Sequence, residues 1–243
     1  MIATTEQSQA SEHTASEKVG WVIASDPLIG EQLQAGLAHE GFKTRIFVPD
    51  QQTPDGNSAL LSSVAQAIDE ATSPNIVLLS LLPEKLCHPQ SIEELGPDQW
   101  RAMVHAPVML TFQVMAKLGK ALSGKQATVV VIGPTLGHIG GAGITPLCTV
   151  LEAQRGMVKS AARQWGERGL TVSWVGVAPE AYNVALGDLD RTTGPEFGPA
   201  HRAIGRVPAL SDAAQAATLL ATPAGRMITG HTINVDGGEW MLP

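Results

Sequence analysis

The chain has 243 residues, of which 44% are hydrophobic and 16% are charged, and its formal net charge is −7. This length suits a single α/β domain, and the acidic balance argues against nucleic acid or an anionic membrane as the main partner. No run of about 18 apolar residues occurs, so we expect no transmembrane helix. The two cysteines, Cys87 and Cys148, lie far apart and predict reduced thiols in a cytoplasmic protein.

Residues 1–18 are rich in Ser, Thr, Gln and Glu and contain no apolar segment. This composition predicts a flexible N-terminal tail rather than a signal peptide. Residues 19–243 are expected to form the folded domain, which begins with a β-α-β unit: a strand over 18–24, a helix over 29–40 closed by Gly41, and a strand over 44–48. Asp26 is predicted to cap the helix and so to satisfy the N–H groups that would otherwise attract a phosphate.

The middle of the chain continues the alternation of helices and strands. A polar loop over 51–57 precedes a predicted helix over 60–70 and a fully apolar strand over 75–82. Residues 83–96 are irregular, and a helical pattern over 98–122 contains Pro107. Because a proline inside a helix removes one hydrogen bond and clashes with the preceding turn, we expect a kink there.

Residues 129–177 predict a second crossover unit around which the domain is organised. It consists of a strand over 129–132, a glycine-rich loop over 133–143, a helix from near Pro146 to near Gly166, and a strand over 170–177. Gly166 and Gly169 suit a left-handed cap at the helix end. A helix over 211–220, with Ser211 or Asp212 near its cap, and a strand over 227–235 follow. The pattern predicts an α/β fold: a single Rossmann-like doubly wound parallel sheet with helices on both faces.

Two stretches resemble the short-chain dehydrogenase/reductase family. Residues 156–179 are similar to the second half of that domain, and residues 228–238, ending in Val-Asp-Gly-Gly, are similar to its C-terminal signature. The resemblance covers residues 19–243. It implies a family whose catalysis uses an Asn, a Ser, a Tyr and a Lys. In this alignment those four positions hold Pro107, Pro134, Leu147 and Leu151, respectively.

The resemblance also implies the loss of the cofactor-binding features. Three glycines in the first β-α turn of the family surround the pyrophosphate. Those positions here hold Ala24, Leu28 and Gly30, of which only the last keeps a glycine, at the position with a packing role. The Asn-Asn-Ala-Gly of the family's cofactor wall is replaced by residues 79–82, Leu-Ser-Leu-Leu. We therefore expect this chain to bind no cofactor.

Other residues were considered as catalytic groups. The single tyrosine, Tyr182, is followed four residues later by Leu186, so the family's Tyr–Lys pair cannot be rebuilt there. A packing or surface role is the simpler interpretation of each remaining candidate, and no cluster has the spacing of a metal site. These candidates are Thr135, His138, His105, and Cys148 beside Glu152.

These features predict a non-catalytic subunit of a short-chain dehydrogenase complex. The family assembles through its long helices and through its last helix and strand, so the expected partner is a homologous active subunit that holds NAD, in a 2:2 heterotetramer. A family pairing of this kind, 2-(hydroxybenzyl)succinyl-CoA dehydrogenase of anaerobic toluene breakdown, suggests a hydroxyacyl-CoA substrate.

Two alternatives remain open at the level of the sequence. One is an oxidoreductase or ligand-binding protein with altered chemistry in the old cofactor cleft. The other is a regulatory protein that binds a partner without catalysis. In the first, an acyl chain would lie against Leu28, Leu79, Leu147 and Leu151.

Overall fold

The computed structural model describes residues 17–49, 56–70, 73–187, 189 and 202–241, so nearly all of the predicted tail lies outside the described part. Six strands form one parallel sheet in the order β2-β1-β3-β4-β5-β6. They are β1 (Val19–Ala24), β2 (Lys43–Phe47), β3 (Ile76–Ser80), β4 (Thr128–Pro134), β5 (Thr171–Val177) and β6 (Thr232–Val235). This sheet confirms the predicted fold class.

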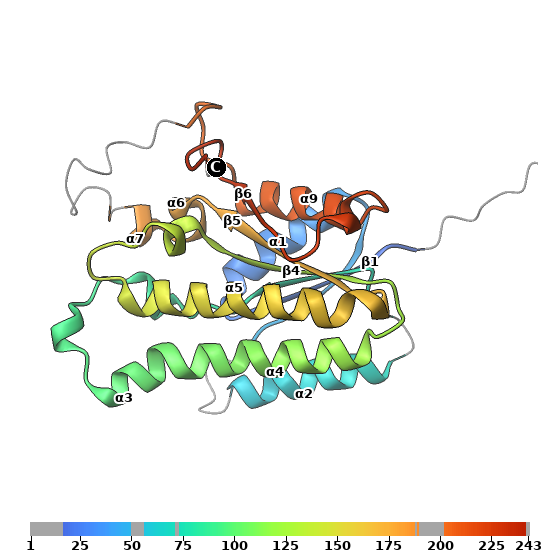
Figure 1. The fold of residues 1–243 in the computed structure, drawn as a ribbon, viewed down its shortest axis with the longest axis horizontal. Coiled ribbons are helices and arrows are strands. Elements are labelled where there is room, and N and C mark those ends of the chain that lie inside the picture. The colour runs from blue at the N-terminus through green and yellow to red at the C-terminus, as the bar shows by residue number, and fades with distance from the viewer. Residues whose placement is uncertain (1–16, 50–55, 71–72, 188, 190–201, 242–243) are drawn as a thin grey trace, which may run out of the picture.

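Helices cover both faces of the sheet (Figure 1). On one face α1 (Pro27–His39) packs against α9 (Leu210–Leu220), and on the other α4 (Ala106–Ala121) lies between α2 (Gly56–Asp69) and α5 (Thr145–Trp165). Because both faces are covered, the central strands β3 and β4 are buried along their whole length. The described part of the chain also contains the short helices α3 (Pro97–Trp100), α6 (Pro179–Tyr182) and α7 (Val184–Gly187).

The predicted helix ends of the first β-α-β unit are confirmed. Asp26 has extended backbone angles, and its side chain accepts hydrogen bonds at the start of α1. Gly41 follows α1 with φ +78°, a left-handed conformation that glycine adopts without steric penalty. At the end of α5, Gly169 is also left-handed (φ +74°), whereas Gly166 stays right-handed and opens a 3₁₀ turn over Gly166–Arg168.

The helix before β4 is divided differently from the expectation. The chain runs through α3, a π-helical segment over Arg101–His105, and then α4, in whose first turn Pro107 lies. The Ala106 N–H donates to the carbonyl of Arg101, five residues back. A proline has no N–H and crowds the carbonyl four residues back, and the widened π turn accommodates this without breaking the helix.

Other boundaries also differ. Gly133 and Pro134, predicted to be in a loop, extend β4 because they pair with Gly176 and Val177 of β5, and Thr135–His138 is a 3₁₀ helix. The last strand is shorter than predicted, because Gly230 (φ +78°) turns the chain just before β6. Two 3₁₀ helices, Glu84–Cys87 and Ile92–Glu94, lie in the segment that was predicted to be irregular. The helix α2 begins at Gly56, earlier than predicted. Ala209 holds the cap position of α9, where its N–H donates to Asp212.

Candidate functional site

The four positions aligned with the family's catalytic residues lie in the apolar core. Leu147 and Leu151 are on the face of α5 that packs on the sheet, and neither has any exposed area. Pro134 ends β4, and Pro107 is buried in the first turn of α4. None of these four side chains carries a group that can donate or accept a proton.

The core around Leu151 is closely packed. A Cβ atom placed on Gly133 would lie 2.9 Å from Leu151 Cδ2 and 2.8 Å from the ring of Trp174. Three of the four leucines proposed above to line an acyl pocket, Leu79, Leu147 and Leu151, are fully buried in this core. That proposal is wrong for these three residues, because their side chains pack against the strands and leave no surface for a ligand.

Tyr182 does not replace the missing tyrosine. It lies in α6, and its hydroxyl is 2.8 Å from the hydroxyl of Ser80 at the end of β3. Burial raises the pKa of the Tyr182 hydroxyl well above its usual range. Because it is buried and already hydrogen-bonded, this hydroxyl serves to join α6 to the sheet.

The side chain of Asp26 binds the backbone N–H groups of the first β-α turn. Asp26 Oδ1 accepts hydrogen bonds from the N–H groups of Leu28 (2.8 Å) and Ile29 (3.4 Å). These are the donors that a phosphate uses at a helix N-terminus. A Cβ on Gly30 would lie 2.7 Å from Ile46 Cδ1, which confirms the packing role of this remaining glycine. Leu28 itself is 68% exposed and extends away from the core.

A hollow of about 470 Å³ lies beside this turn, at the carboxyl ends of the strands. Its lining includes the carboxylates of Asp26, Glu84 and Glu180, together with apolar side chains such as Leu28 and Val184. Glu180 also forms an ion pair with Arg202. The carboxylates of Asp26 and Glu84, and that of Glu180 with its partner Arg202, therefore lie around the place where a dinucleotide of this fold would put its pyrophosphate.

The sheet itself is asymmetric about this turn. In doubly wound sheets a dinucleotide spans the point where the strand order reverses, with three strands on each side. Here the order reverses between β1 and β3, and only β1 and β2 lie on one side, whereas four strands lie on the other. In the described residues, the half that would carry one mononucleotide therefore has one strand fewer.

A polar cluster lies at the carboxyl ends of β4 and β6. Arg155 of α5 donates from Nη1 to His138 Nδ1 (2.8 Å) and to Glu152 Oε1 (2.6 Å). Burial, and then the charge of Arg155, lower the pKa of His138. Thr135 Oγ1 and Asn234 Oδ1 are buried without a hydrogen-bond partner in the described part of the chain.

Thr135 and His138 are thus brought into one polar cluster, whereas the other candidates lie apart. Arg155 is not among the residues predicted from the sequence, although it lies one helical turn after Leu151 on the same helix. Asn234 could not have been assigned to this cluster before the sheet order was known, because it comes from β6.

The remaining candidates have little reactivity. Burial raises the pKa of the Cys148 thiol to about 11 and that of Cys87 to about 12, so both thiols stay protonated near neutral pH. His105 is exposed in the π-helical segment. Within the described ranges, no three His, Cys, Asp or Glu side chains gather as metal ligands, and no helix has both the length and the apolar character to span a bilayer.

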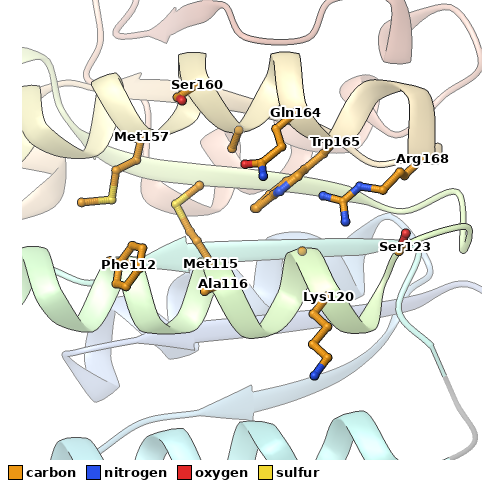
Figure 2. A pocket seen from close by; sticks show the side chains of 12 residues that line it. Phe112, Met115, Ala116, Lys120, Ser123, Met157, Ser160, Gln164, Trp165 and Arg168 are labelled. Atoms are coloured by element: carbon orange, nitrogen blue, oxygen red, sulfur yellow. The ribbon is translucent and has the colours of Figure 1, made fainter.

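The outer face of α4 and α5 carries a groove of about 540 Å³. Figure 2 shows Phe112 and Met115 from α4 facing Met157 and Trp165 from α5. The two helices approach closely because α4 has Gly119 at the crossing, where a Cβ would lie 2.6 Å from the Trp165 ring. The side chain of Phe112 is 53% exposed, so the groove has an exposed apolar residue at one end and polar side chains, such as Lys120 and Arg168, at the other (Figure 2).

Comparisons with known proteins place this fold in a family. The family model for enoyl-(acyl carrier protein) reductase matches residues 58–239. The 3-oxoacyl-[acyl-carrier-protein] reductase of Vibrio harveyi is 28% identical over 148 residues, which are 60% of this chain and 59% of the relative. The Vibrio cholerae enzyme of the same name is 29% identical over the same shares. The matched part thus spans about 59% of the length of these curated relatives.

Solved structures share the architecture. Sorbitol-6-phosphate 2-dehydrogenase of Erwinia amylovora superposes with a TM-score of 0.72 at 17% identity, covering 92% of this chain and 100% of that one. A short-chain dehydrogenase/reductase mutant from Serratia marcescens gives 0.70 at 21% identity, covering 91% and 97%. The family model covers most of the chain, including the long helices and the C-terminal signature. The chain therefore belongs to the short-chain dehydrogenase/reductase family, whose members are oxidoreductases that generally bind NAD or NADP.

Proposed function

We propose that this chain is a non-catalytic subunit of a short-chain dehydrogenase complex, and that it binds no cofactor itself. The observation that carries this proposal is the burial of Leu147 and Leu151 in the core. Hydride transfer to or from a carbonyl carbon needs a group that moves a proton at the oxygen. The two positions that supply this group and its neighbour in the family hold side chains without a titratable atom.

The environment of the first turn supports the same conclusion. Asp26 takes up the N–H groups at the start of α1, and Glu84 and Glu180 add negative charge to the hollow beside it. The losses at the catalytic and cofactor positions agree with each other. Such agreement is expected of a chain that keeps the fold for assembly and has given up the reaction.

The proposed partner is a homologous, active subunit in a 2:2 heterotetramer, with NAD bound in the partner. The groove between α4 and α5 suits this role because the exposed Phe112 and the half-buried Met157 present apolar surface on two long helices. Two-fold assembly places the same helices of two related chains against each other, so a homologous chain offers a complementary face. The last helix and strand are the second expected surface.

The proposed reaction of the complex is the NAD-dependent oxidation of a hydroxyacyl-CoA, and its most specific form is the oxidation of 2-(hydroxybenzyl)succinyl-CoA. The names of two relatives support an acyl thioester as the substrate class. Two relatives are named for reactions of acyl groups carried by acyl carrier protein, which hold the acyl chain through the same type of thioester.

The test is to co-express this chain with a homologue that keeps the Tyr and the Lys, and to measure the complex by native mass spectrometry and its NAD binding by calorimetry. We expect a 2:2 complex with two NAD sites, and no NAD binding by this chain alone. A homo-oligomer that binds one nucleotide per chain would contradict the proposal. A partner complex without dehydrogenase activity would instead favour a regulatory protein.

A second candidate function rests on the hollow beside α1. This hollow of about 470 Å³ is open and lies where doubly wound folds hold their ligands, and its mixed lining suits a ligand other than a dinucleotide. In this case the chain would be a ligand-binding protein or an oxidoreductase of altered chemistry. Thermal shifts with acyl alcohols and acyl amides, which carry no pyrophosphate, are measured on the wild type and on Val184→Asp. A shift in the wild type that is lost in the variant shows that this hollow binds a ligand.

A further inference from the structure

A second hollow, of about 590 Å³, lies between α5 and the turn that leads into β6. It is on a different side of α5 from the groove that faces α4, and it shares no lining residue with that groove. Neither the catalytic positions nor the first β-α turn contributes to it. Its residues are Arg155, Lys159, Ala162, Arg163, Thr229, Gly230, His231 and Thr232.

The lining is positively charged. Arg155, Lys159 and Arg163 follow one another at spacings of four residues, so they lie on one side of α5. None of the described lining residues carries a carboxylate. The whole chain has a net charge of −7, so this hollow concentrates positive charge on a protein whose overall charge is negative.

Arg155 is held in position at one end of the hollow. Its side chain is only 15% exposed, its Nε donates to Thr232 Oγ1 (3.3 Å), and its Nη1 donates to Glu152 Oε1 (2.6 Å) and His138 Nδ1 (2.8 Å). These bonds fix the plane of the guanidinium before any ligand arrives, which reduces the entropy lost on binding.

Lys159 and Arg163, in contrast, are exposed and form no ion pair with the residues that the structure describes. They follow Arg155 along the helix on the side of the same hollow. Two cations without an acidic partner, next to a third whose position is fixed, are the arrangement that an anion with several oxygens can use.

We propose that this hollow binds the phosphate group of a small phosphorylated molecule. The planar fork of Arg163 suits the oxygens of a phosphate, the ammonium of Lys159 adds a second charge, and Arg155 can contribute its Nη2, since its Nε and Nη1 already bind Thr232, His138 and Glu152. The volume of about 590 Å³ is larger than a phosphate group and leaves room for the organic part of such a molecule. The inference does not depend on the proposed function, because it uses other residues.

The probes are inorganic phosphate and pyrophosphate, titrated into the full chain by calorimetry at about 50 mM NaCl, where screening of exposed charges is moderate. We expect both to bind, with pyrophosphate tighter because it carries more oxygens and charge. Lys159→Ala and Arg163→Ala should each weaken pyrophosphate binding about tenfold, since a hydrogen bond to a charged group contributes on that scale.

The matched control is the double variant Lys117→Ala/Lys120→Ala, which removes the same charge from the exposed surface of α4. It should bind pyrophosphate as the wild type does, whereas Lys159→Ala/Arg163→Ala should lose most of the affinity. Circular dichroism and melting temperature without ligand show that each variant folds. Absence of pyrophosphate binding to the wild type overturns the proposal, and so does an equal loss in both double variants, because the anion would then sense only overall charge.

Discussion

Leu151, which the sequence alignment places at the position of the family's lysine, is part of the apolar core. Its side chain has no exposed area and packs so closely on Gly133 that a Cβ there would lie 2.9 Å from Leu151 Cδ2. A lysine at this position would bring an ammonium group among apolar side chains. A buried charge without a partner is strongly unfavourable, so returning the family's residue cannot by itself restore the family's chemistry.

We therefore expect Leu151→Lys to lower the free energy of unfolding by about 3 kcal/mol or more. Urea unfolding followed by circular dichroism measures this change. Ser160→Lys, at an exposed position of the same helix, is the control and should change the stability by no more than about 0.5 kcal/mol. Equal stability of Leu151→Lys and wild type would mean that this part of the core is open to water, and the proposed loss of catalysis would lose its main support.

Folding lowers the pKa of His138, and this shift gives a testable dependence of stability on pH. As a neutral ring it accepts a hydrogen bond from Arg155 at Nδ1, and a protonated ring cannot accept one. Burial and the charge of Arg155 lower the pKa of His138, although Glu152 and Asp236 oppose this effect. In the unfolded chain the ring has its ordinary pKa of about 6.5. As the pH falls below that value, the unfolded chain therefore binds the proton first.

The contribution of His138 to stability is thus complete above about pH 6.5 and is lost as the pH falls through its lowered pKa in the folded protein. We expect His138→Gln to reduce the loss of stability between pH 7.5 and pH 5, by at most about 1.4 kcal/mol per pH unit. Unfolding curves at these two pH values test the difference. His105→Gln, at an exposed histidine, should keep the wild-type dependence on pH.

At the scale of elements, glycines determine how closely the helices pack. Gly36 of α1 faces α9, where a Cβ would come within 2.7 Å of the Cβ of Ala214 and would clash with the carbonyl oxygen of Ser211. Gly156 of α5 is also inside a helix, but a Cβ there would meet nothing within 4 Å. The same residue type therefore has a packing role in one helix and none in the other.

Replacing each of these glycines by alanine should give opposite results. Gly36→Ala is expected to destabilise the protein by about 1 to 3 kcal/mol, because α1 and α9 must move apart. Gly156→Ala is expected to stabilise it by up to about 1 kcal/mol, because alanine favours the helix and restricts the unfolded chain. Melting temperatures of the two variants, measured side by side, test the prediction. Stabilisation in both would mean that α1 and α9 are not in close contact.

At the scale of the whole molecule, the proposed assembly depends on the face formed by α4 and α5. Phe112 of α4 and Met157 of α5 line opposite sides of the groove (Figure 2). Met115 and Trp165, which also line it, belong to the buried core. A carboxylate in the centre of such a face would be removed from water when the partner docks. An unpaired charge at the centre of an interface opposes association much more than one at its rim.

We expect Phe112→Glu to weaken the complex with the homologous active subunit at least tenfold, as a single substitution at an interface centre commonly does. Size-exclusion chromatography with light scattering, on the co-expressed pair, measures the fraction in the heterotetramer. Ile92→Glu replaces another exposed apolar side chain, 57% exposed and outside the groove, and should leave the complex intact. An unchanged complex with Phe112→Glu would exclude this face as the contact.

The alternation of strands and helices, and several helix ends, could be predicted from the sequence alone. The central strands β3 and β4 are nearly continuous apolar runs because both faces of the sheet are covered there, and the long helices carry apolar residues at intervals of three and four. Asp26 and Gly41 were assigned their roles correctly because a helix end needs specific backbone partners and angles that few residue types supply. These are local requirements, and a short stretch of sequence contains them.

The packing environment of each residue depended on the tertiary structure. Leu28, Leu79, Leu147 and Leu151 are alike in sequence, yet the first is largely exposed while the others are fully buried. The π-helical segment lies just before Pro107, where the proline ring would crowd the carbonyl of the preceding turn. The sequence contains the proline but does not show how the helix adapts to it. The grouping of His138, Arg155 and Asn234 and the basic hollow beside β6 join residues far apart in the chain. Local patterns thus determined the elements, and the order of strands in the sheet decided which side chains meet.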